Sequence, residues 1–338
     1  MKFRLINRLL TLAAGCAIAS SAMAEPRELK FSVYNAETHW LVSDVFKPFA
    51  ADVEKFSNGE LKVNVMAGAV LGGAREQLGL AEKGIADIAF VIPSYTRNRF
   101  LYTEAGLLPF AFDSAEQATN AMSSLRDKYL NAEFDSVKLL MVGTTSPSAL
   151  VTTVPVNSLA DMKGLNLRGA GGAQTAMLKE VGANVLSMPV SDAYLAFQRG
   201  ALQGTIIPLA SAPGYKFHEV VKFVNPLNFS VTMTAIVANK DTWASLTPSQ
   251  QAAIEKAADV ARVNQGKGFD REDSTGLKTL EDAGSKSTRL PAADKAKLAE
   301  IASPLWDEWV KAADKRGLKA EQFMKDLRAA IAANPVKQ

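Results

Sequence analysis

Short strands and helices alternate along most of this chain, and that alternation limits the possible folds more than any other feature. Residues 29–34 and 61–66 alternate apolar and polar side chains, as strands do. Between them, residues 44–56 carry apolar side chains at helical spacing, and Asn58-Gly59 provides a stop signal. Because this order of elements repeats toward residue 239, the sequence predicts an α/β fold with parallel sheets and helices on both faces.

The last hundred residues are helical in character. Thr247-Pro248-Ser249-Gln250 reads as a capping box with proline at the first helical position, and a long helix is expected to about residue 283. No low-complexity linker separates the parts of the chain. Because the chain is too long for one typical core, we expect two lobes interwoven by several crossings.

The N-terminus resembles a secretory signal peptide. Lys2, Arg4 and Arg8 precede an apolar run of residues 9–19, and Ala22-Met23-Ala24 supplies the small-residue pattern of a cleavage site. The run is too short to span a membrane comfortably. We therefore predict that residues 1–24 are a signal peptide, that cleavage follows Ala24 and that the mature protein works in the periplasm.

Cysteine usage and charge exclude several classes of function. Cys16 is the single cysteine, so a chain cleaved after Ala24 has no disulfide, thiol nucleophile or cysteine metal ligand. The full chain has 38 Lys+Arg and 35 Asp+Glu, and the predicted signal peptide removes three basic residues. The mature chain is then formally neutral, which argues against binding to nucleic acid or an anionic membrane.

One segment is typical of an anion site. Residues 158–172 read as a turn, a short buried strand that ends at Arg168, and glycines that open a helix. A helix start offers free backbone N–H groups, and a guanidinium fits a carboxylate with two parallel hydrogen bonds. The same spacing also suits an arginine that pairs with a surface carboxylate, so on the residues alone both interpretations stay open.

Catalytic and cofactor motifs are absent from the sequence. Neither His39 nor His218 has a second histidine or a cysteine nearby, so no metal site is predicted. Gln174 interrupts a dinucleotide-binding glycine pattern, and no cofactor is expected. His39 and Trp40 follow the first strand, where α/β sheets bind ligands, but a tryptophan packed at a helix start explains them equally well.

The mature chain as a whole resembles the DctP-type substrate-binding proteins of tripartite ATP-independent periplasmic (TRAP) transporters. The resemblance rests on several phrases in a fixed order: Leu71–Glu76, Gly84–Phe90, Ala160–Arg168, Val181–Pro189, Asp192–Gly200, Gln203-Gly204 and Lys216–Phe223. It implies a two-lobe periplasmic binding protein fold with hinge strands and a long helix spanning both lobes. It also implies that Arg168 grips a ligand carboxylate and that a membrane permease receives the ligand.

The departures from the family pattern bear on the ligand. Ser148 stands where many members carry a second arginine, and Ile206-Ile207-Pro208 replaces a more polar run. An apolar wall disfavours hydroxyl-rich ligands, because their buried polar groups go unpaired. We therefore predict a small monocarboxylate with an apolar or aromatic body. The expected ligand-binding residues are Arg168, Tyr95, Trp40, His39, Ser148, Gly171, Gly172, Val190, Ile207 and Phe90.

We therefore predict that the protein is a periplasmic solute-binding protein of a TRAP transporter. We expect it to be monomeric and to have no enzymatic activity. Lobe I is expected to comprise residues 25–147 and about 236–285, and lobe II residues 148–235 and about 286–338. Two alternatives remain open: a sensor protein that presents the ligand to a receptor, and a periplasmic enzyme on the same scaffold. For the enzyme, Ser148 with His39 is the one pair that the sequence offers, and it lacks a third orienting group.

Overall fold

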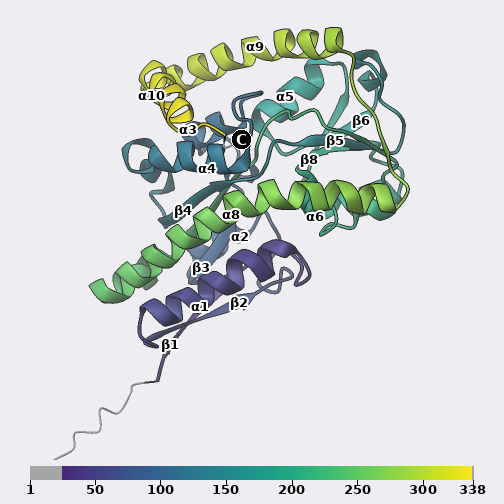
Figure 1. Ribbon diagram of the computed structural model, residues 1–338. Helices are drawn as coiled ribbons and strands as arrows, with labels where there is room; N and C mark the ends of the chain where they lie inside the picture. Colours follow the sequence, from purple (N-terminus) through teal and green to yellow (C-terminus); the bar gives the residue numbers. More distant parts are fainter. Residues whose placement is uncertain (1–24, 337–338) are drawn as a thin grey trace, which may run out of the picture.

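A computed structural model describes residues 25–336, and Figure 1 shows two α/β lobes with a long helix, α8, running across both. The predicted signal peptide, residues 1–24, lies outside the described residues. The two-lobe α/β prediction is confirmed. Each lobe is built on one sheet, and the first has the strand order β2-β1-β3-β10-β4. Its strands are β1 (Arg27–Ser32), β2 (Leu61–Met66), β3 (Ile88–Val91), β4 (Lys138–Thr144) and β10 (Met233–Ala238).

The second sheet has the order β11-β9-β5-β8-β6-β7. It consists of β5 (Ala149–Thr152), β6 (Asn166–Gly169), β7 (Asn184–Ser187), β8 (Gly204–Ile207), β9 (Phe223–Asn225) and β11 (Lys286–Ser287). The helices are α1 (Lys47–Phe56), α2 (Gln77–Glu82), α3 (Leu101–Glu104), α4 (Ala115–Ser124), α5 (Gly172–Glu180), α6 (Val190–Gln198), α7 (Lys240–Ala244), α8 (Pro248–Asp282), α9 (Ala292–Lys315) and α10 (Ala320–Ala333).

Both sheets are mixed, whereas the sequence predicted parallel ones. β1 pairs in parallel with β2 and β3, but β10 is antiparallel to β3 and β4. In the second sheet β5 is antiparallel to β8 and β9, while β6 is parallel to β7 and β8. The antiparallel strands adjoin the crossings between lobes. Residues 145–148 join β4 to β5, and residues 226–232 join β9 to β10.

Helix α8 is the third crossing, and its start confirms the predicted capping box. The Thr247 hydroxyl accepts from the Gln250 N–H at 3.3 Å, and the Gln250 side chain accepts from the Thr247 N–H at 3.1 Å. The first part of the helix buries Ile254 and Ala257 in the core of lobe I. Near its other end, Leu280 is buried in lobe II. The helix therefore contributes to both cores, as a helix that spans the lobes must.

The C-terminal helices differ from the expected division, which put residues 286–338 in lobe II. The beginning of α9 packs on lobe II through Leu298 and Ala302. Its end and α10 return to lobe I, where Trp309 and Phe323 join the core beside α4. Figure 1 shows α9 passing over the top of the molecule to α10, on the side of α4. The buried side chains of α10, which are Ala320, Phe323, Met324, Leu327 and Ala330, lie on one face of the helix, and the sequence does not say which lobe covers that face.

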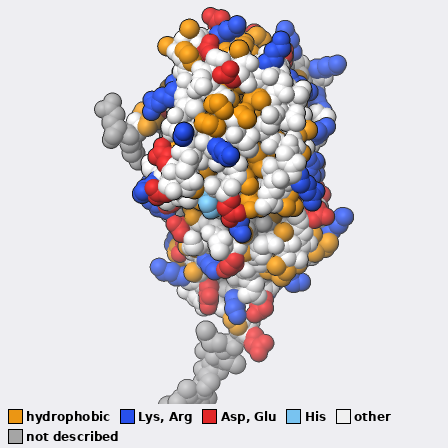
Figure 2. All heavy atoms as spheres, turned by 90° about the vertical axis from the view of Figure 1, so that its right-hand side faces the viewer, with side chains coloured by type: hydrophobic (Ala, Val, Ile, Leu, Met, Phe, Trp, Pro, Cys, Tyr) orange, Lys and Arg blue, Asp and Glu red, His pale blue; other side chains and the backbone are white. Residues whose placement is uncertain are grey.

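Figure 2 shows one face of the molecule, seen from the side of lobe II. Lys and Arg side chains lie among Asp and Glu on this face, with small groups of hydrophobic side chains between them. In the part of the chain that the structure describes, no helix is both long and apolar enough to cross a membrane.

Candidate functional site

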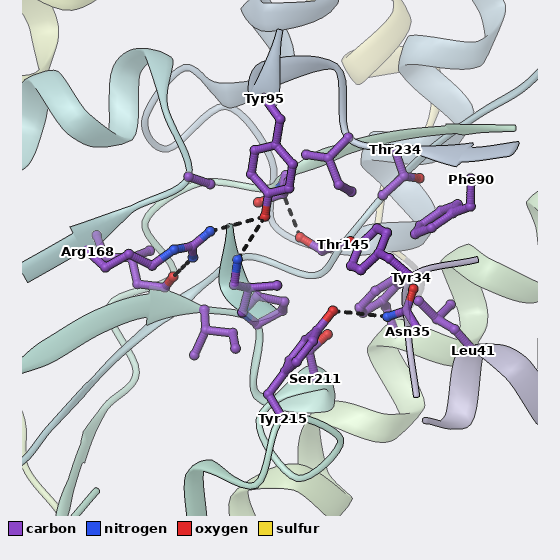
Figure 3. A pocket seen from close by; sticks show the side chains of 18 residues that line it. Tyr34, Asn35, Leu41, Phe90, Tyr95, Thr145, Arg168, Ser211, Tyr215 and Thr234 are labelled. Atoms are coloured by element: carbon purple, nitrogen blue, oxygen red, sulfur yellow. Dashed lines mark hydrogen bonds between the residues drawn. The ribbon is translucent and has the colours of Figure 1, made fainter. Parts of the chain in front are cut away.

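A cavity lies between the two lobes, with an empty volume of about 460 Å³ that includes the part open to solvent. Lobe I, lobe II and α8 all contribute to its wall. The lining residues are Tyr34, Asn35, Leu41, Phe90, Ile92, Tyr95, Thr145, Arg168, Ala170, Val190, Ile206, Ile207, Pro208, Ser211, Tyr215, Thr232, Thr234 and Phe269. Figure 3 shows them from close by. The wall combines many apolar side chains with a few polar ones, which is typical of sites for small organic ligands.

Arg168 provides the positive charge of this cavity. It lies on β6 and is 2% exposed. Its Nε donates to the Met188 carbonyl at 3.0 Å and its Nη1 to the Ile206 carbonyl at 3.3 Å. Among the described residues no carboxylate forms an ion pair with it, so the surface-pair interpretation does not hold. Because burying an unpaired charge is costly, this guanidinium is suited to an external anion.

Tyr95 closes the cavity beside Arg168. It ends the short 3₁₀ helix Pro93–Tyr95 that follows β3 of lobe I. Its hydroxyl oxygen accepts hydrogen bonds from Arg168 Nη2 at 3.2 Å and from the Val190 backbone N–H at 3.1 Å. Because both donors belong to lobe II, Tyr95 joins the lobes. In the described chain the Tyr95 O–H donates no hydrogen bond, so it can donate one to an anion next to Arg168.

The remaining wall is largely apolar. Tyr34 and Phe90 stack with ring centroids 5.8 Å apart and an interplanar angle of 23°. Burial raises the pKa of Tyr34 well above its usual value, so its hydroxyl stays neutral. The other apolar side chains come from both lobes and from α8, and they are Leu41, Ile92, Ala170, Val190, Ile206, Ile207, Pro208 and Phe269. This wall suits a flat or aliphatic body.

Half of the predicted ligand-binding residues lie on the cavity wall: Arg168, Tyr95, Phe90, Val190 and Ile207. Gly171 and Gly172 lie at the beginning of α5 and line a neighbouring, more polar cavity instead. That cavity also contains Arg75, Arg97 and Lys179. Tyr95 and Ala170 line both cavities. The chain turns away after β6, so the helix start and the guanidinium face different spaces.

His39, Trp40 and Ser148 are not on the wall of the main cavity. His39 is 1% exposed, its Nδ1 accepts from the Leu41 N–H, and burial lowers its pKa to about 4. The Trp40 ring packs against Phe269 with centroids 4.9 Å apart, which agrees with a packed tryptophan at a helix start. The Ser148 hydroxyl is buried without a hydrogen-bond partner, and Ser148 and His39 do not bond to each other in the described chain.

Several residues that line the main cavity were not predicted from the sequence. Tyr34 and Asn35 lie two and three residues after the end of β1, so the rule that ligands bind beyond the carboxyl ends of strands points to them. Tyr215 and Phe269 come from segments distant in sequence, and no local pattern places them at the cavity. No group of three or more metal-ligating side chains occurs between residues 25 and 336.

The comparisons with known proteins agree with the fold and with the predicted resemblance. The family described as "Bacterial extracellular solute-binding protein, family 7" (DctP) matches residues 31–312. The "Outer membrane transporter protein TsaT" of Comamonas testosteroni is 24% identical over 343 residues, covering 99% of this chain and all of that protein.

Two similar solved structures contain bound aromatic acids. A marine metagenome TRAP solute-binding protein, described as specific for aromatic acid ligands, holds 3-hydroxybenzoate. It is 26% identical with a TM-score of 0.87, over 93% of this chain and all of that one. A TRAP solute-binding protein of Rhodoferax ferrireducens holds copurified benzoate. It is 25% identical with a TM-score of 0.86, over 91% of this chain and 98% of that one. With its two lobes and interlobe cavity, this chain belongs to the DctP family of TRAP solute-binding proteins.

Proposed function

We propose that this protein captures an aromatic or apolar monocarboxylate between its lobes in the periplasm and delivers it to the membrane permease of a TRAP transporter. The observation that carries the proposal is Arg168, a 2% exposed guanidinium on the cavity wall with no carboxylate partner in the described chain. A ligand carboxylate supplies the missing charge and accepts from the guanidinium and from Tyr95.

The charge count of the cavity favours a single carboxylate. Arg168 is the one Lys or Arg side chain among the residues that line it. A dicarboxylate leaves its second charge against apolar side chains such as Ile92 and Ile207, which costs free energy. A sugar acid carries several hydroxyl groups, and those that meet the same apolar side chains stay unpaired, which also costs free energy. The benzoate and 3-hydroxybenzoate complexes of the two related proteins support an aromatic acid.

The mechanism follows from the position of the cavity. Because both lobes contribute to its wall, a bound ligand contacts both, and its higher affinity for the closed state shifts the protein toward that state. Polar bonds between the lobes add to closure. They include Ser94 Oγ to the Ala170 carbonyl at 3.1 Å and Arg75 Nη2 to the Ser187 carbonyl at 3.2 Å. The closed form is then the one that docks on the permease.

The test is calorimetric titration of the purified protein. We expect benzoate or phenylacetate to bind, and benzamide, succinate and galacturonate to bind at least a hundredfold more weakly. Arg168→Ala should abolish binding, because the carboxylate loses its charge partner. Arg199→Ala, an exposed arginine after α6, is the matched control and should bind as the wild type does. Undiminished affinity in Arg168→Ala, or a preference for succinate or galacturonate, contradicts the proposal.

A further inference from the structure

We propose that the side of the cavity facing Arg168 is a hydroxyl-binding subsite, formed by Asn35 and Tyr215. The preferred ligand is then an aromatic carboxylate with a ring hydroxyl in the meta or para position. This inference rests on the proposed function, since it specifies the ligand that the same cavity takes. It concerns two side chains that are not among the ligand-binding residues predicted from the sequence.

Asn35 supplies an unused acceptor. Its side chain is 1% exposed, and its Nδ2 donates to the Tyr215 hydroxyl oxygen at 3.0 Å. The amide oxygen Oδ1 is buried and has no hydrogen-bond partner among residues 25–336. A buried polar atom left unpaired costs free energy, so such atoms in native proteins normally have a ligand or a water as partner. Asn35 lines the cavity, so a bound ligand is within its reach.

Tyr215 supplies the matching donor. Its oxygen accepts from Asn35, and the Tyr34 hydroxyl also interacts with it. Burial raises the pKa of Tyr215 above its usual value, so the phenol keeps its hydrogen at neutral pH. A ligand hydroxyl both donates and accepts one hydrogen bond. It therefore pairs with the Asn35 oxygen and the Tyr215 hydroxyl at the same time, which a chlorine or methyl substituent does not.

The arrangement of the cavity determines where the hydroxyl must stand on the ring. Figure 3 shows Arg168 on one side of the cavity and Asn35 and Tyr34 on the other, with Tyr215 extending between them from below. A rigid aromatic ring that places its carboxylate at Arg168 directs its meta and para positions away from the guanidinium. An ortho hydroxyl stays beside the carboxylate and does not reach Asn35. Position on the ring therefore distinguishes this subsite from a general preference for polar ligands.

The first experiment compares isomers by calorimetry. Benzoate and phenylacetate are titrated alone and with a hydroxyl at the ortho, meta or para position. We expect the meta or para isomer of the acid that binds to be at least tenfold tighter than the unsubstituted acid, and the ortho isomer not to be. Gains from pairing a buried polar group are of this size or larger. Equal affinities of all isomers and the parent acid overturn the inference but leave the proposed function standing. If none of the acids binds, the proposed function fails and this inference with it.

The second experiment changes the subsite. Asn35→Leu removes the acceptor at similar volume, and we expect the ratio of hydroxylated to unsubstituted affinity to fall to about one. The ratio is the readout because Asn35 also bonds across the lobes, and a weaker closure lowers both affinities equally. Tyr215→Phe should reduce the same ratio. Thr145→Val is the matched control, since the Thr145 hydroxyl already pairs with Ser146 and Thr232. A ratio unchanged in Asn35→Leu and Tyr215→Phe, or equally reduced in Thr145→Val, overturns the inference.

Discussion

The hydroxyl of Tyr95 in lobe I lies 3.2 Å from Nη2 of Arg168 in lobe II and accepts its hydrogen bond. The same oxygen accepts from the backbone N–H of Val190 at 3.1 Å. One phenol therefore connects lobe I to the charged group of the cavity and to the start of α6 in lobe II. The residue that orients the guanidinium also helps to hold the lobes together.

We expect Tyr95→Phe to weaken the binding of a carboxylate ligand by about ten- to a hundredfold, because two interlobe bonds of the closed state are lost. The thermal stability of the unliganded protein should change little, since water pairs with the freed donors when the lobes open. Calorimetry gives the affinity, and small-angle scattering of the unliganded variant should show a larger radius of gyration.

Tyr194→Phe is the matched control for this prediction. The Tyr194 hydroxyl bonds to Glu219 on lobe II alone, and Tyr194 is not on the cavity wall. Its removal should leave affinity and shape unchanged. Equal affinities of Tyr95→Phe and the wild type contradict a role for the Tyr95 hydroxyl in closure.

The raised pKa values of two buried carboxyl groups, Glu104 and Glu133, make the stability of the protein depend on pH. Burial raises the pKa of Glu104 to about 7, and the neighbouring Glu133 adds to the shift. Burial also raises the pKa of Glu133 to about 7, against hydrogen bonds from Thr103 and Tyr102. The folded protein therefore holds these protons more tightly than the unfolded chain does. Their contribution to stability is complete below pH 4.5 and is lost as the pH rises to about 7.

Glu104→Gln removes one of these titrations. We expect the variant to equal the wild type near pH 4 and to be more stable at pH 8, by about 1 to 3 kcal/mol. Denaturant unfolding between pH 4 and pH 8 measures the difference. Glu76→Gln, an exposed glutamate before α2, serves as the control. A difference between Glu104→Gln and the wild type that does not grow with pH rules out this titration.

The place of a residue can be predicted from the sequence where it depends on the residues next to it in the chain. Arg168 was identified because it ends a short buried strand, and the structure places it on the cavity wall. The capping box predicted the start of α8 at Pro248. Phe90 lies in β3 and Tyr95 lies just after it. Ligands of α/β sheets bind beyond the carboxyl ends of strands, so this region was expected to contribute to the site.

Contacts between segments that are distant in sequence could not be predicted in this way. Asn35 and Tyr215 are 180 residues apart and bond to each other across the lobes, and nothing local in either segment indicates this. His39 and Trp40 stand four and five residues beyond Asn35, yet they pack behind the wall, because the helical turn after β1 directs them away from the cavity. The sequence predicted helices near the C-terminus but not that α10 packs on lobe I.

A substitution of Phe323 tests whether α10 packs on lobe I. The ring is fully buried in lobe I, with its centroid 4.9 Å from that of Tyr102 and 5.0 Å from that of Tyr129. We expect Phe323→Ala to lower the free energy of unfolding by about 3 to 5 kcal/mol, because a large cavity remains in the core. Leu195→Ala, which truncates a 52% exposed side chain on α6, should cost less than about 1 kcal/mol. Similar losses in the two variants contradict the packing of α10 on lobe I.

The contact between α8 and lobe II depends on a glycine. A Cβ atom on Gly276 stands 2.0 Å from the Leu209 carbonyl oxygen and 2.5 Å from its carbon. Because both are backbone atoms of the segment that leads to Ser211 on the cavity wall, neither moves cheaply. We expect Gly276→Ala to lower the free energy of unfolding by about 1 to 3 kcal/mol and to weaken ligand binding.

The matched control for this close approach is Gly79→Ala in α2. A Cβ at Gly79 meets no atom within 4 Å, and alanine is the better helix former, so this variant should gain about 0.5 to 1 kcal/mol. Denaturant unfolding compares the two variants, and calorimetry follows the ligand. Opposite signs of the two stability changes indicate that close backbone contact, rather than helix propensity, determines the residue at position 276. If Gly276→Ala is as stable as Gly79→Ala and binds normally, α8 is not held against lobe II as tightly as this geometry requires.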